Sequence, residues 1–183
     1  MKSPYDVPGM PDRPPEGPGP DLPSRGAFTR LHLAFGRAAV YAVSLNRPRM
    51  TFGVRLHARD GDGRVFLVRH SYVPGWHLPG GGIDVRETAR EAAVREAAEE
   101  GGLRITAPPA LFHVYLRRTR AIDDHIVLFT AEGAEAPDDP RGPSAEILAS
   151  GFFAPDDLPA ETTPATRARI AEICDGISPS DWW

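Results

Sequence analysis

Cysteine is nearly absent from this sequence, which contains one such residue, Cys174, among 183. A single thiol cannot form an intrachain disulfide, and this usage is typical of a reducing compartment. The sequence also lacks an apolar run long enough to cross a bilayer, and its first 26 residues lack the apolar core of a signal peptide. We therefore expect a cytoplasmic protein without a membrane span.

The sequence also lacks an excess of positive charge. Its 21 Lys and Arg residues are outnumbered by 25 Asp and Glu residues, which gives a formal net charge of −4 and a pI of about 5.9. Binding to a nucleic-acid backbone regardless of base sequence requires a basic surface. No nucleic-acid partner is expected, and a small-molecule partner is favoured.

Proline is concentrated at the N-terminus, where eight of the 20 prolines lie in residues 1–25. This composition predicts a disordered tail, because it cannot bury enough apolar surface to offset its ordering entropy. Residues 26–183 are long enough for one core, and we interpret them as a single domain with an N-terminal extension at 26–48. Apolar residues in 27–45 recur at helical spacing, although 38–45 also fits a strand. A helix on the domain core is favoured over a membrane-surface helix, and the segment is also a candidate homodimer interface.

Beyond residue 48 the pattern becomes typical of strands. Residues 51–60 and 64–73 are separated by Gly61-Asp62-Gly63, which predicts a β-hairpin in preference to a calcium loop. Further strands are expected at 111–117, 125–131 and 147–153, and a last helix at 165–174. Strands interspersed with helices indicate an α/β or α+β domain layered around a mixed sheet.

A charged helix follows the glycine-rich loop at residues 79–82. Thr88 and Glu91 have the spacing of a capping box, so the helix is predicted to run from 88 to 100, where two glycines end it. Within it, Glu96, Glu99 and Glu100 share one face near the negative end of the helix dipole. This cluster is either a solvated acidic face partly neutralised by Arg95 or a set of oxygen ligands for Mg²⁺ or Mn²⁺.

Taken as a whole, residues 81–103 resemble the signature of the Nudix hydrolase family. That signature reads Gly, five residues, Glu, seven residues, Arg-Glu, an aliphatic residue, any residue, Glu-Glu, any residue, Gly and an aliphatic residue. Its fixed polar and glycine positions are all matched, and the one departure is Ala97, where a bulkier aliphatic residue is usual. The matching residues are Gly81, Glu87, Arg95, Glu96, Glu99, Glu100, Gly102 and Leu103.

The resemblance extends over roughly residues 50–160, because residues 76–80 and 148–159 also look like segments of the family. It implies an α/β/α sandwich with a central mixed sheet. It further implies that Glu96, Glu99, Glu100 and the backbone carbonyl of Gly81 hold Mg²⁺ or Mn²⁺, while Arg95 and Glu87 are structural and orient the carboxylates. Looser or compensated packing is expected beneath Ala97.

The implied reaction is hydrolysis of a phosphoanhydride in a nucleoside-diphosphate-linked substrate, with metal ions neutralising the diphosphate and activating water. Candidates for the catalytic groups are Glu99, Glu100 and, outside the motif, Glu146, which a surface role explains equally well. Weaker candidates for substrate binding are Arg117, Arg118 and Trp76, for which an exposed strand end and a buried aromatic are the simpler explanations.

A different class of function is a Nudix-fold module that binds a nucleotide or regulates without turnover. The intact glutamates argue against it, since such modules often lose some of them. An RNA-end-processing member is disfavoured by the acidic pI, and an isomerase by the absence of a cysteine in the sheet region. The sequence does not select one nucleoside-diphosphate derivative.

Overall fold

The computed structural model describes residues 49–118, 122–137 and 146–183. The tail and the extension predicted for residues 1–48 lie outside these residues. Within the described ranges, no helix is both long enough and apolar enough to span a membrane.

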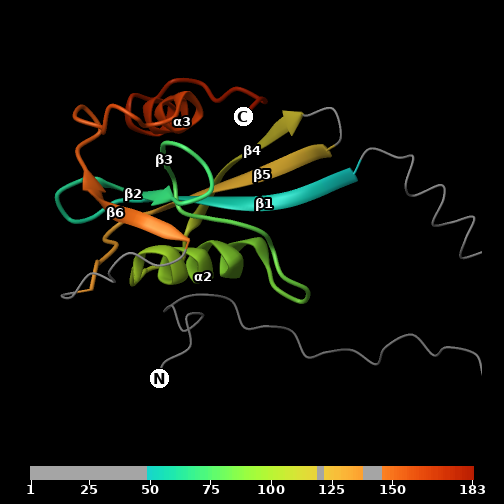
Figure 1. The fold of residues 1–183 in the computed structure, drawn as a ribbon, viewed down its shortest axis with the longest axis horizontal. Helices are drawn as coiled ribbons and strands as arrows, with labels where there is room; N and C mark the ends of the chain where they lie inside the picture. The colour runs from blue at the N-terminus through green and yellow to red at the C-terminus, as the bar shows by residue number, and fades with distance from the viewer. Residues whose placement is uncertain (1–48, 119–121, 138–145) are drawn as a thin grey trace, which may run out of the picture. The chain divides into compact units, whose positions relative to one another are not determined.

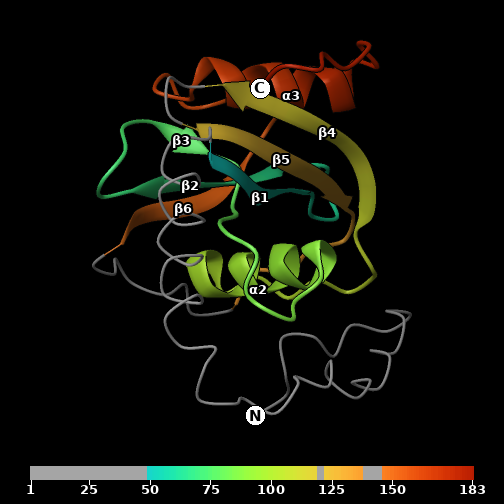
Figure 2. The same ribbon diagram turned by 90° about the vertical axis from the view of Figure 1, so that its right-hand side faces the viewer.

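The described residues form strands β1 to β6 and two helices, α2 and α3. Both helices flank the strands, with α3 on one side and α2 on the other (Figures 1 and 2). The α/β sandwich predicted from the sequence is therefore confirmed. The bounds are β1 Arg49–Ala58, β2 Val65–His70, β3 Trp76–His77, α2 Ala89–Gly101, β4 Ala110–Arg118, β5 Ile122–Ala131, β6 Ile147–Phe153 and α3 Pro164–Cys174.

The strands form two three-stranded sheets, in the orders β1-β5-β4 and β3-β2-β6. Strand β4 runs antiparallel to β5, and β2 runs antiparallel to both β3 and β6. Strand β1 runs parallel to β5, because the Thr51–Asp124 and Arg59–Glu132 contacts both join residues 73 positions apart. The strand layer therefore has mixed directions, as expected.

The predicted hairpin between residues 51–60 and 64–73 is wrong. The chain does reverse tightly, since Asp60 Oδ1 accepts hydrogen bonds from the backbone of Asp62 and Arg64, but β1 and β2 then diverge into different sheets. A single bridge, between Arg59 and Val65, connects the two segments outside the named strands. Strand β2 is buried at Val65 and the three residues after it, and it pairs with β3 on one edge and with β6 on the other, so neither edge is left for β1.

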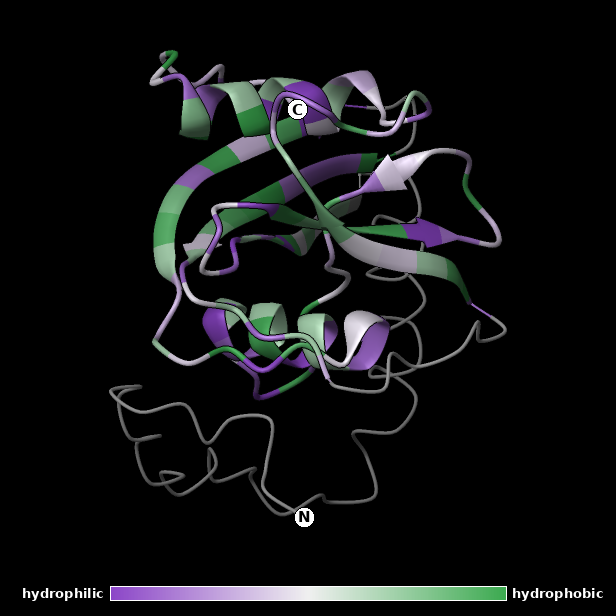
Figure 3. Cartoon of the chain, turned by 90° about the vertical axis from the view of Figure 1, so that its left-hand side faces the viewer, coloured by the Kyte–Doolittle hydropathy of each residue, from purple (hydrophilic) through white to green (hydrophobic). Residues whose placement is uncertain are grey.

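Side chains of β2 alternate between two parts of the core. Phe66 and Val68 belong to a cluster with the buried alanines of α2, whereas Val65 and Leu67 belong to a cluster with Ile170 of α3. Hydrophobic and hydrophilic residues accordingly occur next to one another within the strands and within both helices (Figure 3).

The packing beneath α2 is close despite the small residue at position 97. Ala97 is fully buried, and the Phe66 ring lies so near Gly101 that an added Cβ there would be 2.4 Å from the ring. Phe66 of β2 therefore fills the space beside Gly101, one helical turn after Ala97, and compensation beneath Ala97 itself stays a prediction.

A C-terminal segment after α3, for which the sequence predicts no helix or strand, lies along β4. The backbone N–H of Leu116 donates to Asp181 at 2.8 Å, and the N–H of Trp183 donates back to Leu116 at 3.1 Å. The Trp183 ring also packs edge-on against Tyr115, with 5.4 Å between ring centroids. Part of the β4 edge that β5 leaves open is thereby covered.

Candidate active site

The glycine-rich loop before α2 is held along β1 by backbone hydrogen bonds. Val54 N–H donates to Gly81 and Leu56 N–H to Pro79, both at 2.9 Å. Gly80 has a φ of +143°, and a Cβ added to it would lie 2.1 Å from the Val54 carbonyl oxygen. No other residue fits this close approach, so the loop conformation depends on glycine at position 80.

Helix α2 begins as the sequence predicts. The Thr88 hydroxyl accepts a hydrogen bond from Glu91 N–H, and the Glu91 carboxylate accepts one from Thr88 N–H, which completes a capping box. Gly102 ends the helix in the left-handed conformation. The three glutamates of the last two turns are thus carried on a helix that is defined at both ends.

Arg95 is the centre of an ion-pair network on α2. Its guanidinium donates two hydrogen bonds to Glu87, at 2.8 and 3.0 Å, one to Glu96 at 2.8 Å and one to Glu99 at 3.0 Å. It also donates to the Gly82 carbonyl at 3.0 Å. The hydrogen bonds that Arg95 donates to Glu87, and then those to Glu96 and Glu99, raise the pKa of Arg95 above its usual range, so the side chain stays charged. One cation therefore connects the loop, the nearly buried Glu87 and two glutamates of the cluster.

Glu100 is the most perturbed carboxylate of the cluster. Burial raises its pKa to about 7, against the opposing effects of the hydrogen bond from Gly80 N–H and the charge of Arg55; Glu96 and Glu146 raise it further. The Gly80 N–H to Glu100 Oε2 distance is 2.8 Å, and His70 Nε2 lies 3.5 Å from Oε1. A carboxylate this close to other carboxylates is stabilised by a cation.

The three glutamates of the motif and Glu146 line one pocket of about 240 Å³. Gly81 borders it, and a Cβ there would lie 2.5 Å from Glu96 Oε1, so a larger residue at this position would displace the Glu96 carboxylate. Among the described residues, no three His, Cys, Asp or Glu side chains stand in an arrangement that could hold a metal ion as they are placed. Arg95 is the cation that contacts Glu96 and Glu99 in this arrangement.

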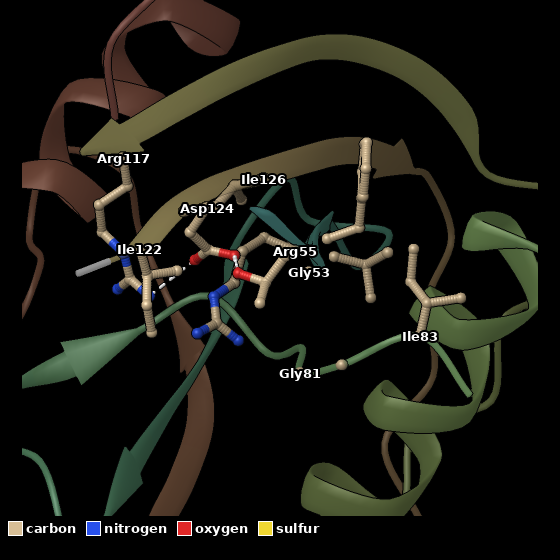
Figure 4. Close-up of a pocket in the computed structure, with 12 residues that line it drawn as sticks. Gly53, Arg55, Gly81, Ile83, Arg117, Ile122, Asp124 and Ile126 are labelled. Atoms are coloured by element: carbon tan, nitrogen blue, oxygen red, sulfur yellow. Dashed lines mark hydrogen bonds and ion pairs between the residues drawn. The ribbon is translucent and has the colours of Figure 1, made fainter. Parts of the chain in front are cut away.

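A second pocket of about 570 Å³ shares Gly81 with the first (Figure 4). Arg117 lines it and forms an ion pair with Asp124 at 2.7 Å, and Asp124 also accepts a hydrogen bond from the Thr51 hydroxyl at 2.6 Å. The apolar part of the wall consists of Phe52, Val54, Ile83, Ile122 and Ile126.

The other two candidates for substrate binding do not line either of these pockets. Arg118 lies 3.3 Å from Asp123, with its guanidinium 5.5 Å from the centre of the Trp182 ring. Trp76 packs edge-on against Phe153, with 4.9 Å between ring centroids. Both placements agree with the simpler explanations given from the sequence.

The larger pocket is also lined by Arg55, a charged residue that was not predicted from the sequence. Arg55 lies on β1, and its Nη1 atom is buried and has no hydrogen-bond partner. Burial lowers the pKa of Arg55, while the charges of Glu100 and Glu96 oppose that effect. The available signal was an arginine placed between the apolar residues Val54 and Leu56, but in an alternating strand such a residue is usually solvated.

Comparisons with known proteins agree with this arrangement. The family model described as NUDIX domain matches residues 47–173. A Bacillus subtilis (strain 168) protein named "Putative 8-oxo-dGTP diphosphatase" is 33% identical over 113 residues, which cover 62% of this chain and 72% of that protein. A "MutT-like protein" of Streptomyces ambofaciens is 28% identical over 118 residues, covering 64% and 73%.

Solved structures give the same result for the fold. The crystal structure of a MutT NUDIX hydrolase from Burkholderia pseudomallei superposes with a TM-score of 0.59 at 29% identity, covering 68% of this chain and 98% of the other. Since the family model matches most of the chain, and Gly81 and the three glutamates of the signature line one pocket, this chain belongs to the Nudix hydrolase family.

Proposed function

We propose that this Nudix hydrolase uses Mg²⁺ or Mn²⁺ to cleave a phosphoanhydride bond in a nucleoside-diphosphate-linked small molecule. One observation carries the proposal: the motif glutamates Glu96, Glu99 and Glu100 are all present and line the same pocket as Glu146. The relative named as an 8-oxo-dGTP diphosphatase supports a nucleotide substrate.

The residues of the pocket fit a divalent cation by their chemistry. Carboxylate and carbonyl oxygens are the ligands that Mg²⁺ and Mn²⁺ prefer. Glu96, Glu99 and Glu100 would hold the ion, together with the Gly81 carbonyl, which keeps one lone pair beside its bond to Val54 N–H. When bound, the ion neutralises charge on the diphosphate and lowers the pKa of water.

The remaining residues are assigned by their contacts. Arg95 and Glu87 orient the carboxylates, because Arg95 connects Glu87 to Glu96 and Glu99. Glu146 is a candidate general base, together with Glu99 and Glu100, because it lines the same pocket and its charge acts on Glu100. It would accept a proton from the water that attacks phosphorus, while the bond from phosphorus to the leaving phosphate oxygen breaks.

Arg117 is the candidate substrate contact that the pocket geometry favours, since it lines the larger cavity. Assignments of Arg118 and Trp76 to substrate binding receive no support from these pockets. A cytoplasmic location, a homodimer and the absence of a nucleic-acid partner stay predictions from the sequence.

The test is release of phosphate or nucleoside monophosphate from a panel of nucleoside di- and triphosphate derivatives, with Mg²⁺, Mn²⁺ or EDTA. We expect metal-dependent cleavage, and we expect Glu100→Gln or Glu96→Gln to lower kcat by about a hundredfold or more with little loss of stability. Glu135→Gln is the matched control, because Glu135 is exposed and pairs with Arg104. Unchanged turnover in Glu100→Gln would contradict the metal assignment.

The alternative function, a nucleotide-binding module without turnover, makes a different prediction for the same panel. It predicts that a nucleotide binds tightly, as measured by calorimetry, while no compound is cleaved with either metal ion. The complete set of carboxylates in the pocket favours the hydrolase.

A further inference from the structure

We propose that Arg55 binds a phosphoryl oxygen of the substrate, at the junction between the glutamate pocket and the larger pocket. This inference rests on the proposed function and names a substrate contact that lies outside the signature motif. It assigns the nucleoside side of the substrate to the larger pocket and an anionic phosphate group to Arg55.

Arg55 has unsatisfied hydrogen-bonding capacity. Its Nη1 is buried without a partner, and a buried donor on a charged group is costly when it stays unpaired. Figure 4 shows the Arg55 side chain among the residues that line the larger pocket, with the Gly81 loop below it. An oxygen anion that enters this space would satisfy the donor.

The other charged groups near Arg55 already have closer partners. Arg95 contacts Glu96 and Glu99, and Gly80 N–H contacts Glu100. Arg117, the other arginine of the pocket, pairs with Asp124 at 2.7 Å. Arg55 attracts Glu100 and Glu96 electrostatically over a longer distance, so its charge lies near the site while its buried Nη1 has no hydrogen-bond partner. It is therefore available to a ligand.

The volume and the lining of the larger pocket also fit such a ligand. Its volume of about 570 Å³ lies within the range of sites for small molecules. Phe52, Ile83 and Ile126 provide apolar surface for a planar ring, and Arg55 lies on the side toward the glutamates. A ligand with a ring at one end and a diphosphate at the other matches this order of groups.

The experiment compares Arg55→Gln, Arg55→Lys and the native chain. Arg104→Gln is the matched control, because it removes one positive charge from an exposed ion pair with Glu135. Calorimetric titrations in EDTA use ADP, GDP, CDP and UDP and the four corresponding nucleosides, so that no turnover occurs and no metal ion contributes to binding. In parallel, KM and kcat are measured with Mg²⁺ for the best compound of the activity panel.

We expect Arg55→Gln to weaken binding of the preferred diphosphate by about tenfold or more, as for the loss of one charge-assisted hydrogen bond, and to leave nucleoside binding unchanged. KM should rise by a similar factor, Arg55→Lys should retain part of the affinity, and Arg104→Gln should match the native chain. The melting temperature of Arg55→Gln without ligand should not fall, because no hydrogen bond of Nη1 is lost.

The inference is overturned if diphosphate affinity and KM are the same in Arg55→Gln and the native chain, or if the native chain binds no diphosphate. Equal weakening of nucleoside and diphosphate binding, with a lower melting temperature, would assign Arg55 a structural role and also overturn it. The proposed function fails separately, when calorimetry shows binding but no compound is cleaved with either metal ion.

Discussion

Replacing Arg95 with Met removes the centre of the network that connects Glu87 to the glutamate cluster. The Glu87 side chain is 3% exposed and that of Arg95 13% exposed, so the variant leaves a carboxylate buried without its main cationic partner. Breaking a buried pair from one side costs about 3–5 kcal/mol, because the remaining charge is not solvated. Glu87 keeps the hydrogen bond from Asp84 N–H, which favours the lower end, about 3 kcal/mol.

This loss is measurable by urea denaturation and by thermal unfolding. A decrease of about 3 kcal/mol corresponds to a melting temperature lower by roughly 10 °C for a domain of this size. Glu87→Gln should recover part of the loss in the Arg95→Met background, and the double-mutant cycle should give a coupling energy of about 2 kcal/mol. The control is Arg104→Met, which breaks an exposed pair with Glu135 and should cost less than about 1 kcal/mol. The reasoning is refuted if Arg95→Met costs no more than this control.

Two further predictions concern parts of the fold away from the glutamates. His57 is fully buried, and burial lowers its pKa to about 4, so the unfolded chain takes up a proton below pH 6.5 that the folded chain does not. Protonation of His57 in the unfolded chain should therefore lower the free energy of unfolding by about 3 kcal/mol as the pH falls from 6.5 to 4. In urea titrations at several pH values, His57→Gln should show a weaker dependence of this free energy on pH than the native chain. The same pH dependence in both chains would contradict the prediction. Removing residues 180–183 should lower stability by about 2–4 kcal/mol, because Trp183 leaves Tyr115, and should increase self-association in analytical ultracentrifugation, because the β4 edge is exposed. A truncated chain with unchanged stability would show that this segment contributes only a weak contact.

Features that depend on neighbouring residues in the sequence could be predicted. The capping box of Thr88 and Glu91 and the stop at Gly102 are local, so the limits of α2 agree with the sequence to within about one residue. The helical spacing of the glutamates places them around one pocket, and the signature motif carries the family assignment.

Features that depend on distant parts of the chain could not be predicted in the same way. The turn after Asp60 specifies a reversal of direction, but the partners of β1 and β2 depend on which faces and edges become buried. Arg55 looks like an ordinary solvent-facing residue of a strand until the loop at Gly81 and strand β5 close a pocket around it. Residues 180–183 contact β4 at Leu116 and Tyr115, which are distant in the sequence. The covering of the β4 edge by this segment therefore has no signal in the local sequence.

The parallel pairing of β1 with β5 also limits the order in which the fold can form. Partners such as Thr51 and Asp124 are separated by 73 positions, so closing this contact costs far more chain entropy than closing the β4–β5 hairpin. On a ribosome, β1 emerges early and has no strand neighbour in its sheet until β5 follows, and β2 waits still longer for β6. The loop and helix that carry the glutamates are therefore synthesised before the sheets that hold them can be completed, and the active site is a late product of folding.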